Sequence, residues 1–209
     1  MAMRDGRRHR VFCASMADVF DTEAPPGQLE RLWDLIRKTP CLDWLLLTKR
    51  PDRIKHSLPL DWGQGYRNVW LGTSVENQHW ADQRIPLLLG IPATIRFLSC
   101  EPLLGVIDLS PWLPHSTGPA VPIAPEVLMR GSSPIQWVIA GGESGPGARP
   151  ADLAWFRGLR DQCRDAGAAF FMKQVGKSLA APGDSKGGLF ESIPVDLRLR
   201  EFPAVVKLS

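Results

Sequence analysis

Charged and polar side chains follow six apolar runs of this sequence, at the point where each run ends. The candidate catalytic residues are Glu101, Glu143 and Lys173, because acidic and basic groups that meet at one site shift each other's pKa. Residues suited to binding a substrate or cofactor occupy the ends of the same runs: Asp18, Lys49, Arg50, Ser74, Glu76, Gly141, Gly142, Ser144 and Gln174. Opposite charges in one place are typical of active sites, but structural ion-pair networks have the same composition.

Lys49 and Arg50 stand where an apolar run gives way to a helical segment. Cations at such a position suit a carboxylate or a phosphate ligand, and an ion pair with a glutamate at a neighbouring strand end is the structural alternative. Both interpretations of this pair stay open.

The string Gly141-Gly142-Glu143-Ser144-Gly145 is the most distinctive local pattern. Its glycines let the backbone approach a ligand closely, and its amides can form an anion-binding nest. Pro146 occupies the place of the last glycine of the serine-hydrolase elbow, and none of the four histidines follows an apolar run, so a serine hydrolase is not expected. The Cys100 thiol is expected to be buried rather than reactive.

Apolar runs with polar ends are the pattern of parallel strands that are buried on both faces and carry their reactive groups at one mouth. The runs with their polar ends cover residues 11–18, 44–50, 69–77, 95–102, 137–144 and 169–174. Helices are predicted over 28–38, 51–57, 77–89 with a break near Pro86, and 152–166. The alternation predicts an α/β fold, a partial TIM-like parallel (β/α)6 barrel. Because the first apolar run begins at Val11, either the barrel is open as it stands or a first βα unit is missing, and the second interpretation is the one adopted.

Length and composition favour one domain, because 209 residues with 44% hydrophobic side chains suffice for one sizeable core. We divide the chain into a basic leader over 1–10, a barrel domain over 11–177 and a tail or clasp over 178–209. Within the barrel, the stretch 105–134 has no sustained period and is expected to be a long loop. The leader is a solvated terminus or a nucleic-acid arm, and the first role is the commoner one.

Cysteine spacing, hydropathy and charge disfavour several classes of function. The four cysteines, Cys13, Cys41, Cys100 and Cys163, lie far apart in the sequence, so no metal site is predicted in this chain. The sequence has no run of about 18 apolar residues and no signal-peptide core, which predicts a cytoplasmic protein without a membrane segment. The net charge of +3 is too weak to show whether the protein binds nucleic acid, so this partner stays open. A small-molecule or nucleotide substrate and the oligomeric state stay open as well.

Six motifs carry a family resemblance, in one order along residues 11–177: SMADVFD, LLLTKRPDRI, NVWLGTSVENQ, RFLSCEPLLG, WVIAGGESGPGARP and FFMKQVG. They resemble a phage-type family of unknown function whose full-length members begin with a three-cysteine motif. The resemblance implies a barrel similar to that of radical S-adenosylmethionine enzymes, in which the three cysteines would hold a [4Fe-4S] cluster after the first strand. None of the cysteines of this chain matches that motif, and the start of the chain is interpreted as truncated. S-adenosylmethionine and the cluster are therefore expected of a full-length form and not of this chain.

Three functions follow from these observations. The first is a radical S-adenosylmethionine-like enzyme acting on a nucleotide or nucleic acid, although the missing cysteines leave enzymatic activity of this chain undecided. The second is a non-catalytic module that binds a nucleotide or a partner protein, and the third is a non-functional fragment. Most tryptophans are expected in the core, and stacking on a base is considered for Trp80 or Trp112 alone.

Overall fold

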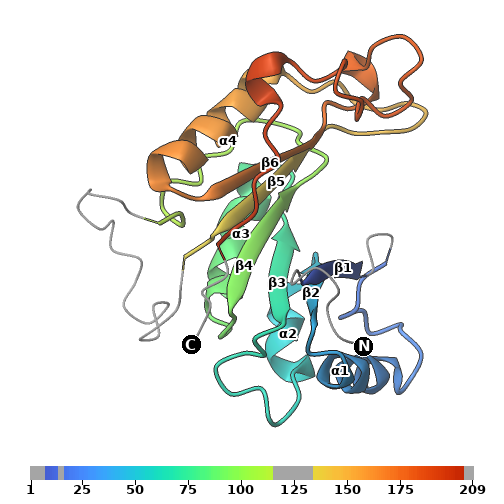
Figure 1. Cartoon of the computed structure of the whole chain (residues 1–209), viewed down its shortest axis with the longest axis vertical. Coiled ribbons are helices and arrows are strands. Elements are labelled where there is room, and N and C mark those ends of the chain that lie inside the picture. The colour runs from blue at the N-terminus through green and yellow to red at the C-terminus, as the bar shows by residue number, and fades with distance from the viewer. Residues whose placement is uncertain (1–7, 14–16, 115–133, 205–209) are drawn as a thin grey trace.

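Six parallel strands form one sheet that curls into a half-barrel, as the apolar runs predict. The computed structural model describes residues 8–13, 17–114 and 134–204. The strands are β1 (His9–Cys13), β2 (Leu42–Thr48), β3 (Val69–Ser74), β4 (Ile95–Cys100), β5 (Trp137–Gly141) and β6 (Ala169–Gln174). Each strand pairs with the next one in the sequence, so all the carboxyl ends lie at one edge of the sheet, here called the mouth (Figure 1).

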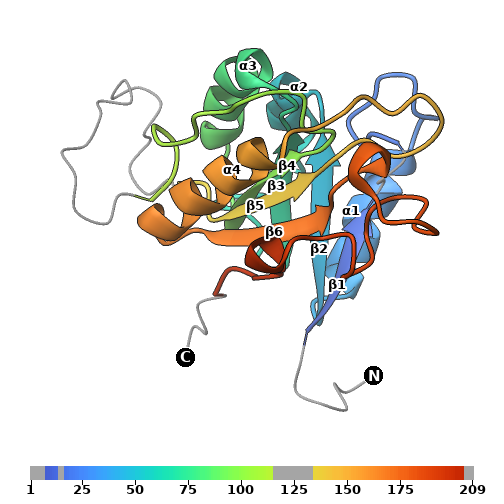
Figure 2. The ribbon, with the colours of Figure 1, turned by 90° about the horizontal axis from the view of Figure 1, so that it is seen from above.

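In the described parts of the chain, four α-helices connect strands and pack on the outer face of the sheet (Figure 2). They are α1 (Gln28–Lys38), α2 (Pro51–Ser57), α3 (Gln78–Leu89) and α4 (Leu153–Ala166). Helix α4 begins where the Asp152 carboxylate accepts the Ala154 N–H and ends at Gly167 with a φ of 73°, as its sequence predicts. None of the helices in the described parts of the chain is long and apolar enough to cross a membrane.

The predicted break of the third helix near Pro86 is wrong, because α3 continues through this proline to Leu89. Proline removes one hydrogen bond from a helix interior. The buried side chains on both sides of it, Ala81, Ile85 and Leu88, pack into the core and offset that loss.

The inner face of the sheet carries its own apolar cluster, separate from the larger core under the helices. Its buried members are Leu45, Trp70, Ile95, Phe97, Trp137 and Ile139. Gly72 leaves room for this cluster, since a Cβ at that position would overlap the ring of Phe97. The Nε1 of Trp70 is buried here and has no hydrogen-bond partner among the described residues. Aromatic rings therefore fill the half-barrel below the mouth.

A C-terminal segment covers the free edge of β6 (Figure 2). Arg200 forms an antiparallel bridge with Phe171, and the Glu201 N–H donates to the Phe170 carbonyl. Phe202 then packs on Trp137 with ring centroids 5.2 Å apart. This pairing satisfies backbone groups that an open sheet edge would otherwise expose.

Asp184 organises the loop between the two short 3-10 helices η1 (Lys177–Leu179) and η2 (Val195–Leu197). Its carboxylate accepts the Ser192 hydroxyl and the backbone N–H groups of Lys186, Gly187 and Leu189, at 2.7–3.0 Å. These bonds, with the Ser192 hydroxyl the largest cause, hold the pKa of Asp184 well below its usual value.

Replacing Asp184 by asparagine is expected to lower the melting temperature at pH 7 and to make it less sensitive to acid. A carboxylate whose pKa is depressed in the folded state contributes stability above its unfolded pKa, ordinarily near 3.8, and loses it as the pH falls toward the folded pKa. The melting temperature of the unsubstituted protein should therefore fall more than that of Asp184→Asn between about pH 4 and pH 2. Circular dichroism melts at pH 7, 4 and 2 measure this, and an equal fall in both proteins contradicts it.

Several predicted segments lie partly outside the described residues. The parts outside are residues 1–7 of the basic leader, 14–16 of the first apolar run and 115–133 of the long loop. The first strand begins at His9, two residues earlier than predicted. In the described part of the long loop, Ile107, Leu109 and Leu113 are buried, so this part packs on the core.

Candidate active site at the strand ends

Glu76, just after β3, is the most buried acid at the mouth, with 6% of its surface exposed. Its Oε1 lies 2.8 Å from Nζ of Lys49, and its Oε2 lies 2.9 Å from Nη1 of Arg84. The same Nη1 donates to the Ser74 carbonyl at 2.8 Å. Both oxygens therefore have a cationic partner, which a buried carboxylate requires because an uncompensated buried charge is strongly destabilising.

Asp18 attaches the loop after β1 to the end of β2. It accepts the Thr48 hydroxyl at 2.8 Å and the Lys49 N–H at 3.0 Å. The Arg50 guanidinium lies 3.3 Å from Asp18 and 3.0 Å from Asp21. The two predicted residues Asp18 and Arg50 therefore meet, and their contacts fix the backbone that carries Lys49.

A cavity of about 680 Å³ lies beside these two groups of charges. Its lining residues are Ala17, Asp18, Asp21, Leu47, Thr48, Lys49, Arg50, Ser74, Trp80 and Arg84, and we call it the β2–β3 cavity. Trp80 leaves 38% of its surface exposed, and Cζ of Arg84 lies 4.0 Å from the centre of its ring. The cavity thus offers an aromatic face together with charges of both signs.

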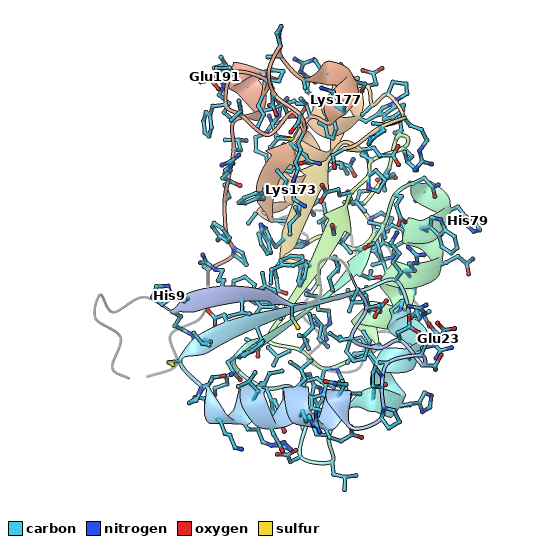
Figure 3. All side chains as sticks on the ribbon, turned by 90° about the vertical axis from the view of Figure 1, so that its right-hand side faces the viewer. His9, Glu23, His79, Lys173, Lys177 and Glu191 are labelled. Atoms are coloured by element: carbon cyan, nitrogen blue, oxygen red, sulfur yellow. The ribbon has the colours of Figure 1, made fainter. Side chains whose placement is uncertain are left out.

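Two of the predicted catalytic residues, Glu101 and Lys173, form a second ion pair at the mouth. Glu101 Oε2, after β4, lies 2.6 Å from Lys173 Nζ, on β6. β5 runs between these two strands and ends at Gly141, where a Cβ would lie 3.0 Å from Oε1 of Glu101. Gly141 therefore provides the space in which the two side chains meet. Figure 3 shows Lys173 on β6.

Glu143 binds Arg149 of its own loop rather than another predicted site residue. The Arg149 guanidinium donates through Nε at 2.8 Å and Nη2 at 2.7 Å, and the Arg149 backbone N–H donates at 2.7 Å. These hydrogen bonds lower the pKa of Glu143 to about 2. At neutral pH Glu143 is an ionised group with both oxygens occupied, a state better suited to holding the loop than to accepting a proton.

Gly142 and Gln174 join the ends of β5 and β6. The Gly142 N–H donates to the Gln174 carbonyl at 3.0 Å, and the buried Gln174 amide donates to the Gly142 carbonyl at 3.0 Å. Ser144 is exposed in the loop that follows. These residues shape the backbone at the mouth, and none of them lines the β2–β3 cavity.

Arg84 is the main residue of this site that the sequence reasoning missed. It lies on α3 between Ala81, Ile85 and Leu88, all of which are buried. A charged residue inside the apolar stripe of a helix needs a buried partner, and this signal points to Arg84. Asp21 and Arg149 were missed as well, because each lies in a loop away from the strand ends.

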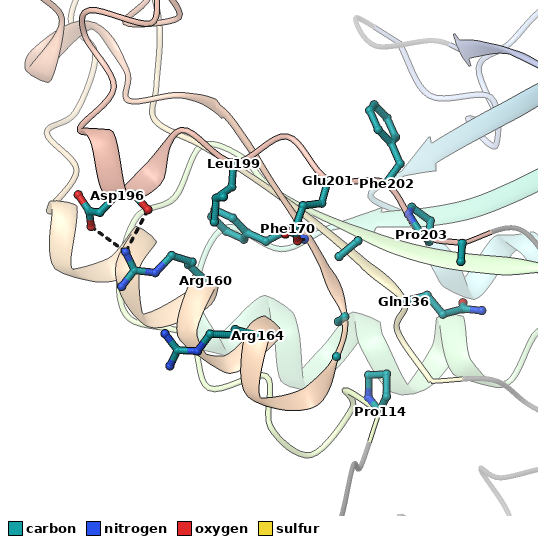
Figure 4. Close-up of a pocket in the computed structure, with 14 residues that line it drawn as sticks. Pro114, Gln136, Arg160, Arg164, Phe170, Asp196, Leu199, Glu201, Phe202 and Pro203 are labelled. Atoms are coloured by element: carbon teal, nitrogen blue, oxygen red, sulfur yellow. Dashed lines mark hydrogen bonds and ion pairs between the residues drawn. The ribbon is translucent and has the colours of Figure 1, made fainter. Parts of the chain in front are cut away.

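A larger cavity, of about 1000 Å³, lies at the opposite ends of β5 and β6, between α4 and the C-terminal segment (Figure 4). Its Arg160 pairs with Asp161 and Asp196, and its Arg164 pairs with Asp161. None of the predicted site residues lines it. Because ligands of parallel α/β sheets bind at the carboxyl ends of the strands, we place the candidate site at the mouth instead.

The four cysteines do not gather at one place. Cys13 ends β1, Cys41 precedes β2, and the buried Cys100 and Cys163 belong to the core under the helices. Burial raises the pKa of Cys100 well above its usual value and that of Cys163 to about 12, so both are neutral thiols at pH 7. Across the described ranges, no group of three or more His, Cys, Asp or Glu side chains is arranged to hold a metal ion.

A family profile with the description "Protein of unknown function (DUF5131)" matches residues 1–191. The chain belongs to this family. The matched range of the DUF5131 protein contains all six strands and every mouth residue described above. No curated protein and no solved structure matches the chain. A phage-type origin and a three-cysteine motif in full-length relatives stay predictions.

Proposed function

We propose that this DUF5131 protein binds a nucleoside-type ligand of mixed charge in the β2–β3 cavity, with S-adenosylmethionine as the leading candidate. The observation that carries the proposal is the exposed ring of Trp80 at a cavity that Lys49, Arg50 and Arg84 also line. An indole stacks on a nucleobase, and such cations bind a carboxylate or a phosphate.

The balance of charges at the cavity favours a zwitterion over a polyphosphate. The three cations meet three carboxylates, those of Asp18, Asp21 and Glu76. Several phosphates placed here would face these acids at a cost, whereas a ligand with an amino group, a carboxylate and a sulfonium can pair with both signs. Carboxylates also accept hydrogen bonds from ribose hydroxyls.

An iron–sulfur cluster does not fit the thiols of this chain. Such a cluster needs three or four thiolates that converge on one point. The four cysteines are spread over β1, the start of β2, β4 and α4, and two of them are deeply buried thiols. We therefore derive no radical step for this chain.

Glu101 and Lys173 are the proposed acid–base pair, should a nucleotide or nucleic acid be the substrate. The Lys173 amine is about half exposed, at the mouth, and its carboxylate partner is mostly buried behind it. An exposed ammonium held by a buried acid is positioned to donate a proton to a group bound at the mouth. Glu143, with its low pKa, is assigned to positioning the loop after β5.

Replacing Trp80 by alanine is expected to weaken the binding of S-adenosylmethionine. A stacked base contributes about 1–3 kcal/mol, so the Kd should rise roughly 5- to 150-fold. Isothermal titration calorimetry on the purified 209-residue protein measures it.

The matched control is Leu87→Ala, an exposed position of the same helix that does not line the cavity. ATP serves as the comparison ligand, and it should bind more weakly than S-adenosylmethionine. No binding to the unsubstituted protein, or equal binding by Trp80→Ala, contradicts the proposal, and tighter binding of ATP contradicts the preference for a zwitterion.

A non-catalytic nucleotide-binding module is the second candidate function. The observation in its favour is that Lys49, Arg84 and Lys173 each have a carboxylate partner within 3 Å. Cations that are already paired can shape and hold a binding site without any turnover.

A further inference from the structure

A strip of arginine and phenylalanine side chains extends from Arg10 of β1 past Phe171 of β6 to the C-terminal segment. Its members are Arg10, Phe171, Phe190, Arg198, Arg200 and Phe202, and we call it the arginine–aromatic strip. Cζ of Arg10 lies 3.8 Å from the ring centre of Phe202, and Cζ of Arg200 lies 5.2 Å from that of Phe190. The strip is distinct from the β2–β3 cavity, which none of its members lines.

In the described residues, the guanidinium groups of the strip contact rings and backbone carbonyls rather than carboxylates. Arg198 donates to the Ile193 carbonyl and Arg200 to the Gly188 carbonyl, so backbone groups orient these guanidinium groups without neutralising them. Within the described residues, neither these two arginines nor Arg10 forms a salt bridge. An anionic partner would therefore meet three guanidinium groups that no ion pair within the described residues already engages.

Two of the three rings of the strip are exposed, and the third is half-buried. Phe190 and Phe202 leave 45% and 40% of their surface open, and Phe171 packs on Phe202 with ring centroids 5.4 Å apart. Aromatic rings interspersed with guanidinium groups are the pattern of surfaces that bind single-stranded nucleic acids, because bases stack on the rings and phosphates pair with the guanidinium groups.

We propose that the arginine–aromatic strip binds single-stranded nucleic acid. A duplex fits less well, because its paired bases do not present their faces for stacking. Lys173 lies two residues after Phe171 on the same strand, and Figure 3 shows it on β6. A strand bound along the strip therefore passes beside the Glu101–Lys173 pair, which connects the surface to the mouth.

The first test removes the two arginines of the C-terminal segment. Fluorescence anisotropy follows the binding of fluorescein-labelled 20-mers of dT and of U to the purified 209-residue protein between 50 and 300 mM KCl. The double variant Arg198→Gln/Arg200→Gln should raise the Kd at least about tenfold at 100 mM salt. The slope of log K against log[salt] should become less negative by about 1.4, because each lost phosphate contact accounts for about 0.7.

The matched control removes the same charge elsewhere. Arg53→Gln/Lys55→Gln alters two cations of α2, outside both the strip and the β2–β3 cavity, and should leave the Kd within about twofold of the unsubstituted value. A similar loss in this control, or an unchanged Kd in Arg198→Gln/Arg200→Gln, overturns the proposal.

The second variant separates stacking from general attraction to polyanions. Phe190→Leu keeps an apolar side chain and the charge but loses the ring, and it should weaken single-strand binding roughly fivefold or more. A duplex of the same length should bind at least about tenfold more weakly than the single strand. If Phe190→Leu binds normally and heparin or the duplex binds as well as the single strand, the surface attracts polyanions only and the proposal fails. Circular dichroism checks the fold of each variant, and Phe190→Leu decides the outcome if the arginine double variant does not fold.

Discussion

Replacing Arg84 by methionine is expected to lower the free energy of unfolding by about 3–5 kcal/mol. The substitution keeps much of the apolar stem but removes the partner of Glu76 Oε2, and Glu76 is almost fully buried. It also removes the contact of the guanidinium with the Trp80 ring. Lys49 remains beside the other oxygen, but its largely exposed amine does not replace the lost hydrogen bond. Urea denaturation at pH 7, followed by tryptophan fluorescence, measures the change.

Two further variants test whether the loss of stability in Arg84→Met comes from the buried ion pair. Arg157→Met breaks an exposed ion pair with Asp196, which solvent screens, and should therefore cost far less stability than Arg84→Met. The double variant Glu76→Gln/Arg84→Met removes the buried negative charge as well, so it should be more stable than Arg84→Met alone. A loss in Arg84→Met as small as that in Arg157→Met contradicts the buried ion pair.

Replacing Gly142 by alanine is expected to destabilise the protein by roughly 3 kcal/mol, at the upper end of the usual cost of overpacking. A Cβ at Gly142 would overlap the Val175 carbonyl oxygen and lie 2.8 Å from the Gly176 Cα. These are backbone atoms, which cannot turn away as the end of a flexible side chain can. The ends of β5 and β6 would separate, and with them the hydrogen bonds between Gly142 and Gln174.

Gly158 provides the matched control for this substitution. It lies inside α4, and a Cβ there would meet nothing within 4 Å. Alanine is the better helix former, so Gly158→Ala should stabilise the protein by about 0.5–1 kcal/mol. The two glycine-to-alanine changes should therefore move the midpoint of urea denaturation in opposite directions, and a shift in the same direction would falsify the account of Gly142.

The positions of the strand ends could be predicted from the sequence because they depend on a short-range pattern. An apolar run followed by polar residues, repeated with helices in between, allows few arrangements other than a parallel sheet. That pattern was enough to place Lys49, Glu76 and Glu101 at one edge. The pattern did not predict which acid each cation contacts. Lys49 forms an ion pair with Glu76, a glutamate at a neighbouring strand end, which is the structural alternative to ligand binding. Arg50 instead contacts Asp18 and Asp21 of the loop after β1.

The remaining contacts depend on how separate elements dock. Arg84 becomes a site residue because α3 turns its buried face toward the end of β3, which helical periodicity alone does not reveal. Arg96 is nearly fully buried within β4 and donates to the Ile91 carbonyl, a partner that the strand pattern does not predict. Phe202 meets Arg10 across almost the whole length of the chain, and no local signal in either segment indicates that contact.

The pairing of each strand with its successor has a consequence for how the protein folds. Neighbouring strands pair residues 25 to 40 positions apart, so each pairing closes a loop much shorter than the chain, and the sheet can grow by adding one strand at a time. The contact between Arg10 and Phe202 instead joins residues near the two ends of the chain, and its loop-closure entropy makes it the costliest contact to form early. The arginine–aromatic strip is therefore expected to assemble last, which would make it a surface that only the fully folded chain presents.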